Sequence, residues 1–401
     1  MTVQRRNDLP ILGFGCMRFA TKGRGIDMEK AEAQILRAIE LGVNYLDTAY
    51  IYPGSEDAIG QILEKNNLRD KVTLTTKLPQ YLVKKREDLD KYLEEELRRL
   101  RTDHLDYYLF HHMTDIAQWE KLEALGVRDW ISEKKAQGKF LHVGFSFHGN
   151  TEMYLKILSA YDWELSLVQY NYMDEHAQAG REGICAAYEK GVPVFIMEPL
   201  RGGKLVDLLP EKAKKEIASD SHGWTPAEWA FRWLWNQKEI TCVLSGMNSL
   251  EMLEENARIA SAVEAGAWGA EEMAMIDKIH TYINENTKVG CTGCKYCLPC
   301  PRGVDIPGIF SCYNHMYSEK KMSGRKEYYQ TIALRLTPAD ASRCVGCGKC
   351  ESHCPQNIPI RAKLKEASRA LQPFYFKIAA NVSRRFMVGK KKKSTGSGKE
   401  S

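Results

Sequence analysis

Two short runs of cysteine in the last third of the chain have the spacing of iron–sulfur ligands. Successive cysteines are separated by two residues in the first run, and by two, two and three in the second. The runs are Cys291, Cys294, Cys297 and Cys300, then Cys344, Cys347, Cys350 and Cys354. The second spacing is typical of bacterial 4Fe–4S sites, and the first is one residue short before its fourth cysteine. The pattern predicts two 4Fe–4S clusters, which pass electrons one at a time.

A second group of reactive side chains ends three successive apolar segments in the N-terminal half of the chain. Asp47, Lys77 and His111 close these segments, and Tyr52 follows Asp47 by five residues. Any one of them alone is more often a cap, a surface charge or a packed histidine. Neighbouring strands of a parallel barrel end at one rim, where such barrels carry their active sites. Three such residues on consecutive segments therefore indicate a functional site.

These four residue types can together protonate a carbonyl oxygen. A free phenol has a pKa of about 10, and an adjacent ammonium favours its ionised form. Lys77 is therefore expected to lower the pKa of Tyr52. Asp47 can hold Lys77 through a charge-assisted hydrogen bond, and His111 can orient a substrate carbonyl. The set predicts general-acid catalysis at a carbonyl group whose carbon receives a hydride.

The elements that must position these residues alternate between apolar segments and amphipathic helical stretches up to about residue 270. The expected strands are Leu9–Cys16, Val43–Thr48, Val72–Leu78, Leu105–His112, Phe140–Phe147, Leu165–Asn171, Val192–Glu198 and Ile240–Ser245. The expected helices include Met28–Leu41, Glu87–Arg101, Ile116–Gln137 and Leu250–Val263. This rhythm predicts an α/β fold, the TIM (β/α)8 barrel. A doubly wound sheet would need a third glycine after Gly13 and Gly15, which the sequence lacks.

The chain of 401 residues is longer than a single hydrophobic core usually allows. We predict a barrel over residues 1–285, a small, mainly helical ferredoxin-like iron–sulfur domain over 286–373, and a basic, flexible tail over 374–401. The spacer between the cysteine runs has two helical stretches, Ile309–Tyr317 and Gly324–Leu336.

The net charge of +5 comes in good part from the tail, so the composition gives little support to nucleic-acid binding. Lys390–Ser401 has the Gly, Ser and Lys content of a solvated tail. A membrane-surface or partner-docking patch around Arg384, Arg385 and Phe374 is the alternative. No apolar run is long enough for a transmembrane segment, and Met1–Pro10 shows no secretory signal, so we expect a cytoplasmic protein.

The barrel sequence resembles the aldo-keto reductase family over roughly residues 8–265. The segments that carry the resemblance are Asp47–Tyr52, Thr75–Lys77, Asp106–His111, Gly144–Ser146 and Glu254–Asn256. The resemblance implies NADPH or NADH bound over the barrel mouth. It also implies that the family's acid, lysine, aspartate and histidine are Tyr52, Lys77, Asp47 and His111.

The same resemblance implies a set of cofactor contacts. They are Ser146 and Gln169 at the nicotinamide amide, Met197 where the family often stacks a tyrosine, Ser245, Gly246 and Met247 near the ribose–phosphate end, and Glu255 and Asn256 at the adenine. Arg201 is a further candidate, for the pyrophosphate. Gly246 and Met252 stand where the family commonly has a lysine and an arginine for the 2′-phosphate, so NAD and NADP both stay open.

The cysteine-rich segment resembles aldo-keto reductases that carry a ferredoxin-type C-terminal extension, over Cys291–Pro301 and Gly303–Pro307. In two-cluster ferredoxins the fourth cysteine of each run ligates the other cluster. By that rule Cys354 joins the first three cysteines of the first run, and Cys300 joins those of the second. Zinc is the alternative occupant, and Cys312 is an alternative ligand that is more simply a buried thiol.

Together these patterns predict an aldo-keto reductase-type, NAD(P)H-dependent oxidoreductase that acts on an aldehyde or ketone. Electron exchange through two 4Fe–4S clusters would involve a ferredoxin or a flavoprotein as partner. In one alternative the clusters are only structural or oxygen-sensing; in another the chain is a non-catalytic nicotinamide-binding electron-transfer or assembly subunit. A hydride carries two electrons and a cluster accepts one, so coupling them needs a converter, usually a flavin, for which the sequence shows no motif.

Overall fold

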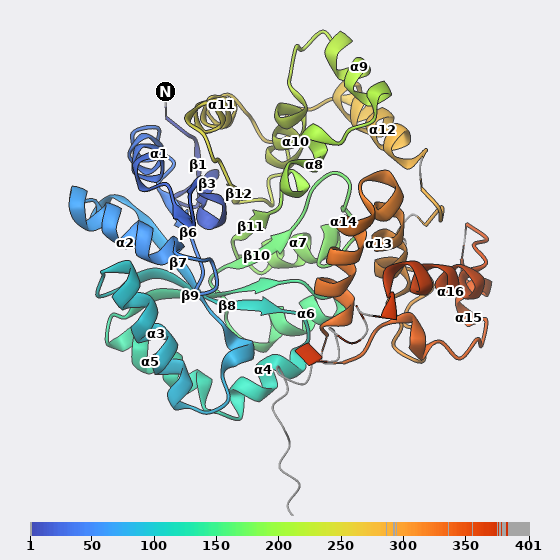
Figure 1. The fold of residues 1–401 in the computed structure, drawn as a ribbon, viewed down its shortest axis with the longest axis horizontal. Helices are drawn as coiled ribbons and strands as arrows, with labels where there is room; N and C mark the ends of the chain where they lie inside the picture. The colour runs from blue at the N-terminus through green and yellow to red at the C-terminus, as the bar shows by residue number, and fades with distance from the viewer. Residues whose placement is uncertain are drawn as a thin grey trace, which may run out of the picture.

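The larger part of the protein is a closed barrel of parallel strands in the order β10-β11-β12-β3-β6-β7-β8-β9, with helices around it (Figure 1). The computed structural model describes residues 2–285, 287–291, 293, 295–335, 337–354, 356–374, 376, 378 and 382–383. The barrel strands are β3 (Leu12–Gly15), β6 (Tyr45–Asp47), β7 (Thr73–Leu78), β8 (Leu105–Met113), β9 (Phe140–Phe147), β10 (Ser166–Gln169), β11 (Val194–Met197) and β12 (Cys242–Ser245). The predicted TIM barrel is confirmed.

Helices cover the outside of the barrel and connect its strands (Figure 1). They are α1 (Met28–Glu40), α2 (Ser55–Asn66), α3 (Glu87–Leu100), α4 (Ile116–Glu123), α5 (Val127–Ala136), α6 (Thr151–Ala160), α7 (Gly180–Glu189), α8 (Lys204–Asp207), α9 (Glu211–Ser219), α10 (Pro226–Trp235), α11 (Leu250–Ser261) and α12 (Ala270–Asn284). The predicted single helix Ile116–Gln137 is wrong, because Gly126 between α4 and α5 has a φ of 76°. That left-handed conformation ends the first helix at little cost for glycine.

The predicted first strand, Leu9–Cys16, is also too long. Its first residues belong to a hairpin of β1 (Arg5–Arg6) and β2 (Leu9–Pro10) that precedes β3. The turn between them uses positive φ values at Asn7 and Asp8, conformations that these two residue types tolerate better than most. Leu9 is buried with the side chains of the barrel interior. A second small hairpin joins β4 (Thr21–Lys22) and β5 (Gly25–Ile26).

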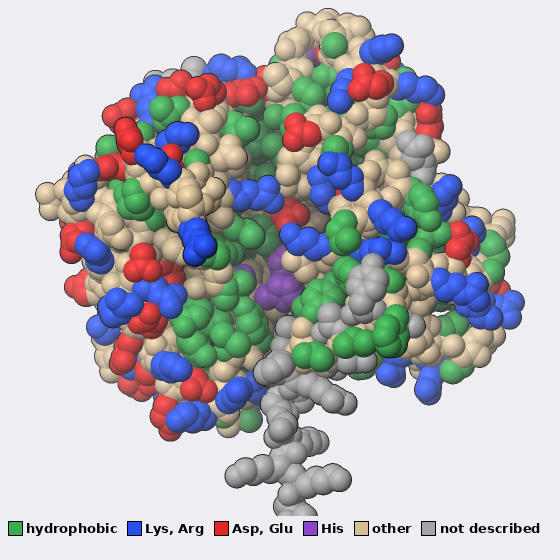
Figure 2. Space-filling view, in the orientation of Figure 1, with side chains coloured by type: hydrophobic (Ala, Val, Ile, Leu, Met, Phe, Trp, Pro, Cys, Tyr) green, Lys and Arg blue, Asp and Glu red, His purple; other side chains and the backbone are tan. Residues whose placement is uncertain are grey.

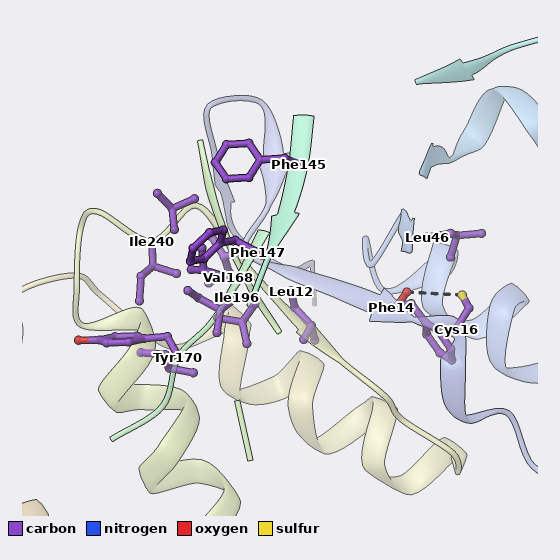
Figure 3. Close-up of a cluster of buried hydrophobic side chains, with 14 of the residues drawn as sticks. Leu12, Phe14, Cys16, Leu46, Phe145, Phe147, Val168, Tyr170, Ile196 and Ile240 are labelled. Atoms are coloured by element: carbon purple, nitrogen blue, oxygen red, sulfur yellow. Dashed lines mark hydrogen bonds between the residues drawn. The ribbon is translucent and has the colours of Figure 1, made fainter. Parts of the chain in front are cut away.

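Alternation along the strands separates an inner and an outer layer of the core. Tyr45 of β6 and Phe195 of β11 lie three strands apart in the barrel, yet their ring centroids are 4.7 Å apart, so they meet across the interior. Phe145 and Phe147 instead pack outward on Tyr154 of α6 and belong to the cluster in Figure 3. Because side chains alternate with a period of two, residues two positions beyond Tyr45 also face inward.

The C-terminal region forms a second, mainly helical body with its own apolar core, as predicted (Figure 1). Its helices are α13 (Ile306–Ser318), α14 (Lys321–Tyr328), α15 (Lys349–Ser352) and α16 (Ile360–Leu371), with a π-helical turn at Tyr329–Ala333. Phe310, Tyr313 and Leu364 are central to this core. Arg384, Arg385 and Lys390–Ser401, on which the tail predictions rest, lie outside the described residues. In the described part, no helix has the length and apolarity that crossing a bilayer requires.

Candidate active site

Four side chains converge at the C-terminal rim of the barrel, as the sequence predicts. The Lys77 ammonium donates to both carboxylate oxygens of Asp47, at 2.7 and 2.8 Å, and to the carbonyl oxygen of Thr48 at 2.6 Å. Its Nζ lies 5.2 Å from the centre of the Tyr52 ring. The Tyr52 and His111 rings are 6.0 Å apart and nearly perpendicular. A phenol, an amine, a carboxylate and an imidazole therefore share one site.

The barrel topology explains this convergence. Asp47, Lys77 and His111 lie on β6, β7 and β8, which are consecutive neighbours in the sheet. Asp47 follows the inward-facing Tyr45 by two residues, and His111 follows the inward-facing Leu109 in the same way. Tyr52 lies in the loop between β6 and α2, so a short connection brings it back over the rim.

The register between β8 and β9 breaks at His111 and His112. Phe110 pairs with Phe145 and Met113 with Phe147, so two residues of β8 face one residue of β9. His112 within this bulge has a φ of 58°, and its amide donates to Ser146 Oγ at 2.8 Å. Bulges of this kind re-aim side chains beside active sites. The sequence carries no signal for the bulge except the doubled histidine.

Burial dominates the electrostatics of the acid and its neighbours. It raises the pKa of Tyr52 above its usual value, and the Lys77 ammonium offsets only part of that rise. The predicted lowering by Lys77 is therefore present, but burial outweighs it and the pKa of Tyr52 is raised. Burial alone would lower the pKa of Lys77, but Asp47 and Tyr52 raise it, so Lys77 stays an ammonium. Tyr52 thus keeps its proton at neutral pH, as a proton donor must.

His111 is a neutral imidazole in this site. Burial lowers its pKa well below the usual value, and the charge of Lys77 lowers it further. Its Nδ1 atom is buried and has no hydrogen-bond partner among the described residues. A buried polar atom without a partner is costly unless a ligand or water satisfies it. His111 is therefore suited to hydrogen-bond a bound ligand.

The two residues assigned to the nicotinamide amide also lie at the rim. Ser146 is buried on β9, and its oxygen accepts from the His112 amide, which leaves its proton free to donate elsewhere. Gln169 ends β10, where its Nε2 donates to Asp174 Oδ2 at 3.1 Å and its Oε1 accepts from Gln178. The orientation of the Gln169 amide is thus fixed by neighbours.

The remaining predicted cofactor residues differ in their hydrogen bonds and in their burial. Ser245 and Asn256 are joined by a 3.2 Å hydrogen bond, and Glu255 accepts one of 3.0 Å from Thr225. Met197 ends β11 half-buried, and Gly246 is exposed just beyond β12. The side chain of Met247 is buried in the hydrophobic core, and its place near the ribose–phosphate end stays a prediction.

Arg201 is not placed as predicted. Its side chain is only 3% exposed and lies in the contact between the barrel and the C-terminal body. It donates to Asp174, to Glu319 at 2.8 Å and to Glu327 at 3.1 Å. A guanidinium held by three carboxylates is not available to a pyrophosphate, so Arg201 belongs to the domain contact and not to the cofactor site.

Arg18 is a basic residue at the barrel mouth that sequence reasoning missed. It follows β3 directly, and its guanidinium lies so close to Gly202 that a Cβ there would stand 2.8 Å from it. Its aliphatic part packs against Gly246. Arg18 is exposed and has no ion pair within the described part of the chain. Figure 2 shows this face hollowed between the two bodies, with basic and histidine side chains around the hollow. A lone arginine gives no motif, which is why the sequence did not reveal it.

The described cysteines of the two runs gather around two small voids in the C-terminal body. Cys300, Cys344, Cys347 and Cys350 line the first, which we call the outer void because Cys347 is exposed. Cys291, Cys297 and Cys354 line the second, the inner void. Cys294 lies outside the described residues. This grouping is the one that the ferredoxin rule predicts, with each fourth cysteine beside the other run.

Cys312, the alternative ligand, lies elsewhere. It is buried in the core of the C-terminal body, where its Sγ is 4.0 Å from Thr331 Oγ1. Burial raises the pKa of this thiol well above its usual value. Cys312 lines neither void, so it is a core residue and not a candidate ligand.

Comparison with known proteins agrees with both bodies. Residues 11–281 match the model of the aldo/keto reductase family, and residues 290–358 match a 4Fe-4S dicluster domain. A methylglyoxal reductase of Escherichia coli is 26% identical over 278 residues, which cover 68% of this chain and 91% of that protein. An aldo/keto reductase from Klebsiella pneumoniae in complex with NADPH has a TM-score of 0.56 and 25% identity, covering 68% of this chain and 91% of that one. An aldo-keto reductase from Bacillus halodurans, 24% identical with a TM-score of 0.57 over 70% of this chain and 96% of its own, shares the fold.

Proposed function

We propose the following function for this chain, which belongs to the aldo/keto reductase family and is an oxidoreductase of that type. It transfers a hydride between NADPH and the carbonyl carbon of a small aldehyde or ketone. The observation that carries this proposal is the convergence of Tyr52, Lys77, Asp47 and His111 at the barrel rim. NADPH, when bound, supplies the hydride. The cofactor present in the Klebsiella pneumoniae structure supports NADPH over NADH.

Each of the four residues has a distinct task in this proposal. Tyr52 donates its proton to the carbonyl oxygen, because its raised pKa keeps it protonated at neutral pH. The neutral His111 donates a hydrogen bond to the same oxygen and orients the substrate. The Lys77 ammonium stabilises the tyrosinate that remains, and Asp47 holds Lys77 in place. Asp47, Lys77 and His111 are buried, whereas Tyr52 is partly exposed, so a substrate would approach on the Tyr52 side.

The cofactor contacts follow from the same rim. Ser146 and Gln169 would hold the nicotinamide amide, and Ser245 with Asn256 would lie at the adenosine end. Arg18 would replace Arg201 as the residue that meets the phosphates, because it is exposed, positively charged and seated against Gly202 and Gly246. A guanidinium binds phosphate through paired hydrogen bonds.

Replacement of Arg18 by alanine is expected to raise the Kd for NADPH about 10- to 150-fold, because a charge-assisted contact is worth about 1.5–3 kcal/mol. The measurement is titration of NADPH fluorescence in the anaerobic protein. Arg24, which lies in the turn between β4 and β5 of the same connection, is the matched control, and Arg24→Ala should leave the Kd unchanged. Equal affinity in wild type and Arg18→Ala would remove Arg18 from the site.

The direct test of the proposed activity is NADPH oxidation with a panel of aldehydes and ketones. Methylglyoxal belongs in the panel because it is the substrate named for the Escherichia coli relative. We expect saturable, carbonyl-dependent oxidation of NADPH. No carbonyl-dependent rate with any member, from protein that binds NADPH, would contradict the proposal.

For the C-terminal body we propose two 4Fe–4S clusters, one at each void. The donor sets fit, because the described thiols of the two runs line the voids beside apolar residues such as Ile306, Phe310 and Leu364. The clusters, when bound, supply one-electron transfer. The predicted cysteines hold them in the arrangement that pairs Cys354 with the first run and Cys300 with the second.

Iron content tests this arrangement. The intact protein should hold about eight iron atoms, and Cys300→Ala about four, because one cluster loses a ligand. Cys300→Ala/Cys344→Ala should also retain about four, since both residues serve one cluster, whereas Cys300→Ala/Cys354→Ala should retain almost none. Cys312→Ala is the control and should match the intact protein. Equal iron in the two double variants would contradict the pairing.

A specific observation favours an electron-transfer role for the clusters over a purely structural one. Val345 is 63% exposed and Cys347 is also exposed, so the outer void lies at the surface. Basic side chains lie around it: Arg302 and Arg361 in its wall, with Arg343 and Lys349 beside it, and Glu351 pairs with Arg361. We propose that an acidic ferredoxin or flavoprotein exchanges single electrons here. Binding of a purified acidic flavodoxin that weakens steeply with salt would support this, and salt-independent or absent binding would oppose it.

A further inference from the structure

A buried ionic cluster joins the barrel to the C-terminal body beside the proposed nicotinamide site. We call it the Arg201 cluster and define it as Asp174, Arg201, His315, Glu319 and Glu327. Arg201 belongs to the turn after β11 (Arg201–Gly203), and Asp174 to the loop after β10. His315 lies on α13, Glu327 on α14, and Glu319 between these two helices. The cluster therefore draws residues from both bodies.

On the barrel side, the cluster ends at the residue assigned to the nicotinamide amide. Asp174 is buried, and its Oδ2 accepts from Arg201, from Gln169 at 3.1 Å and from Asn171 at 3.0 Å. Because Gln169 donates to Asp174, its amide has one orientation, with the oxygen toward Gln178. Movement of Asp174 would remove one of the two hydrogen bonds that orient Gln169 and leave only the one from Gln178.

On the other side, the cluster is held by α13 and its neighbour α14. His315 Nδ1 lies 2.8 Å from Glu327 Oε2 and 3.0 Å from Arg201 Nη2. The first two turns of the same helix contribute Ile306, Pro307 and Phe310 to the wall of the inner void. Helix α13 thus touches the proposed iron–sulfur site near its start and Arg201 near its end. A rigid helix can transmit the position of one end to the other.

Opposite charges hold this contact together. Burial alone would raise the pKa of Glu327, but His315 and Arg201 outweigh it and bring that pKa to about 2. The pKa of Glu319 is also lowered, chiefly by Arg201 against the effect of burial, and Lys204 contacts it at 2.8 Å. Both carboxylates are therefore ionised at neutral pH. A buried ion pair that loses one partner leaves an uncompensated charge, so the partners hold one another in place.

We propose that the iron–sulfur body completes the nicotinamide site of the barrel, with His315 and Glu327 fixing Arg201, Arg201 fixing Asp174, and Asp174 fixing Gln169. These are positioning residues, because none of them touches the substrate. A cavity of about 760 Å³ between the two bodies, lined by Asp174, Gln178 and His315 among others, shows that the cluster lies at the seam and not deep in either body. The inference rests on the proposed assignment of Gln169 to NADPH.

The test is a mutant cycle on NADPH affinity in the iron-loaded protein. Arg201→Met should raise the Kd for NADPH about tenfold, and Glu327→Gln about threefold, with kcat at saturating NADPH within about twofold of wild type. The double variant should bind no more weakly than Arg201→Met alone, because both residues act through one path. Lys363→Met is the matched control: it breaks a pair with Glu366 on α16 of the same body, away from the Arg201 cluster, and should leave the Kd unchanged.

Separate outcomes distinguish the inference from the proposed function. Wild-type NADPH affinity in Arg201→Met and Glu327→Gln, with iron content intact, would overturn this inference alone. Additive effects in the double variant would overturn it too. Absence of NADPH binding by the unaltered protein would overturn the proposed function together with it. If Arg201→Met does not fold, Arg201→Lys keeps the charge but loses the planar fork, and it should show the same rise in Kd.

Discussion

Replacement of Tyr52 by phenylalanine is expected to lower kcat for carbonyl reduction by about 10²–10⁴-fold, the usual contribution of a positioned general acid. The change removes one oxygen atom and keeps the ring beside Lys77 and His111. The Kd for NADPH should stay near the wild-type value, because Tyr52 acts on the substrate oxygen. Steady-state rates with the best carbonyl substrate, together with a fluorescence titration of NADPH, measure the two effects.

Tyr50 offers a matched control in the same loop. Its ring packs against Tyr92 and under the guanidinium of Arg99, on the side away from the catalytic group. Tyr50→Phe also removes one hydroxyl and should leave kcat within about twofold of wild type, as surface-directed changes usually do. Equal rates in Tyr52→Phe and wild type would show that Tyr52 is not the acid.

Replacement of Lys77 by methionine is expected to affect both activity and stability. Lys77 is 1% exposed, and its loss leaves the buried Asp47 carboxylate without its counter-ion. Breaking a buried pair in this way costs about 3–5 kcal/mol of folding stability. The rate should fall by about 10² or more, because the tyrosinate formed in the reaction loses its stabilising charge. Urea denaturation and carbonyl-reduction kinetics measure the two losses.

Two further variants separate these effects. Lys77→Met/Asp47→Asn removes the uncompensated charge, so it should regain part of the lost stability and none of the activity. Lys65→Met breaks an exposed pair with Glu32 and should change neither property appreciably. Full activity in Lys77→Met would contradict the role assigned to the ammonium, whatever its stability.

The barrel and its catalytic rim were accessible from the sequence because both follow from repetition. Eight apolar segments separated by helical stretches allow few folds, and parallel strands end at one rim. Asp47, Lys77 and His111 could therefore be brought together without coordinates. The direction of the Tyr52 pKa could not, because it depends on how completely the phenol is buried, which no local pattern records.

Long-range partners explain the failures at the cofactor site. Arg201 has the composition of a phosphate-binding residue, but its partners Glu319 and Glu327 come from the other body, more than a hundred positions along the chain. Met247 is a loop residue by pattern and a core residue by packing. Arg18 is the opposite case: the sequence pattern did not select it, and only the folded loops place its charge beside Gly202.

In the C-terminal body, the cysteine spacing predicted the kind of site and the helices predicted the kind of body. The grouping of Cys300 with the second run followed from a general rule of two-cluster ferredoxins, and the lining of the two voids has the same grouping. What spacing cannot give is exposure. Only the folded chain shows that Cys347 lies at the surface and that Cys291 faces the seam with the barrel.

Hydride transfer to a carbonyl is tested most directly with NADPH that carries deuterium at both C4 positions, under anaerobic conditions and with a panel of aldehydes and ketones. We expect one deuterium on the carbinol carbon of the alcohol product, detected by mass spectrometry, and no such product from Tyr52→Phe in the same time. Oxidation of the labelled NADPH without deuterium in any alcohol, accompanied by bleaching of iron–sulfur absorbance, would mean that the electrons leave through the clusters and that the barrel rim is not a carbonyl reductase site.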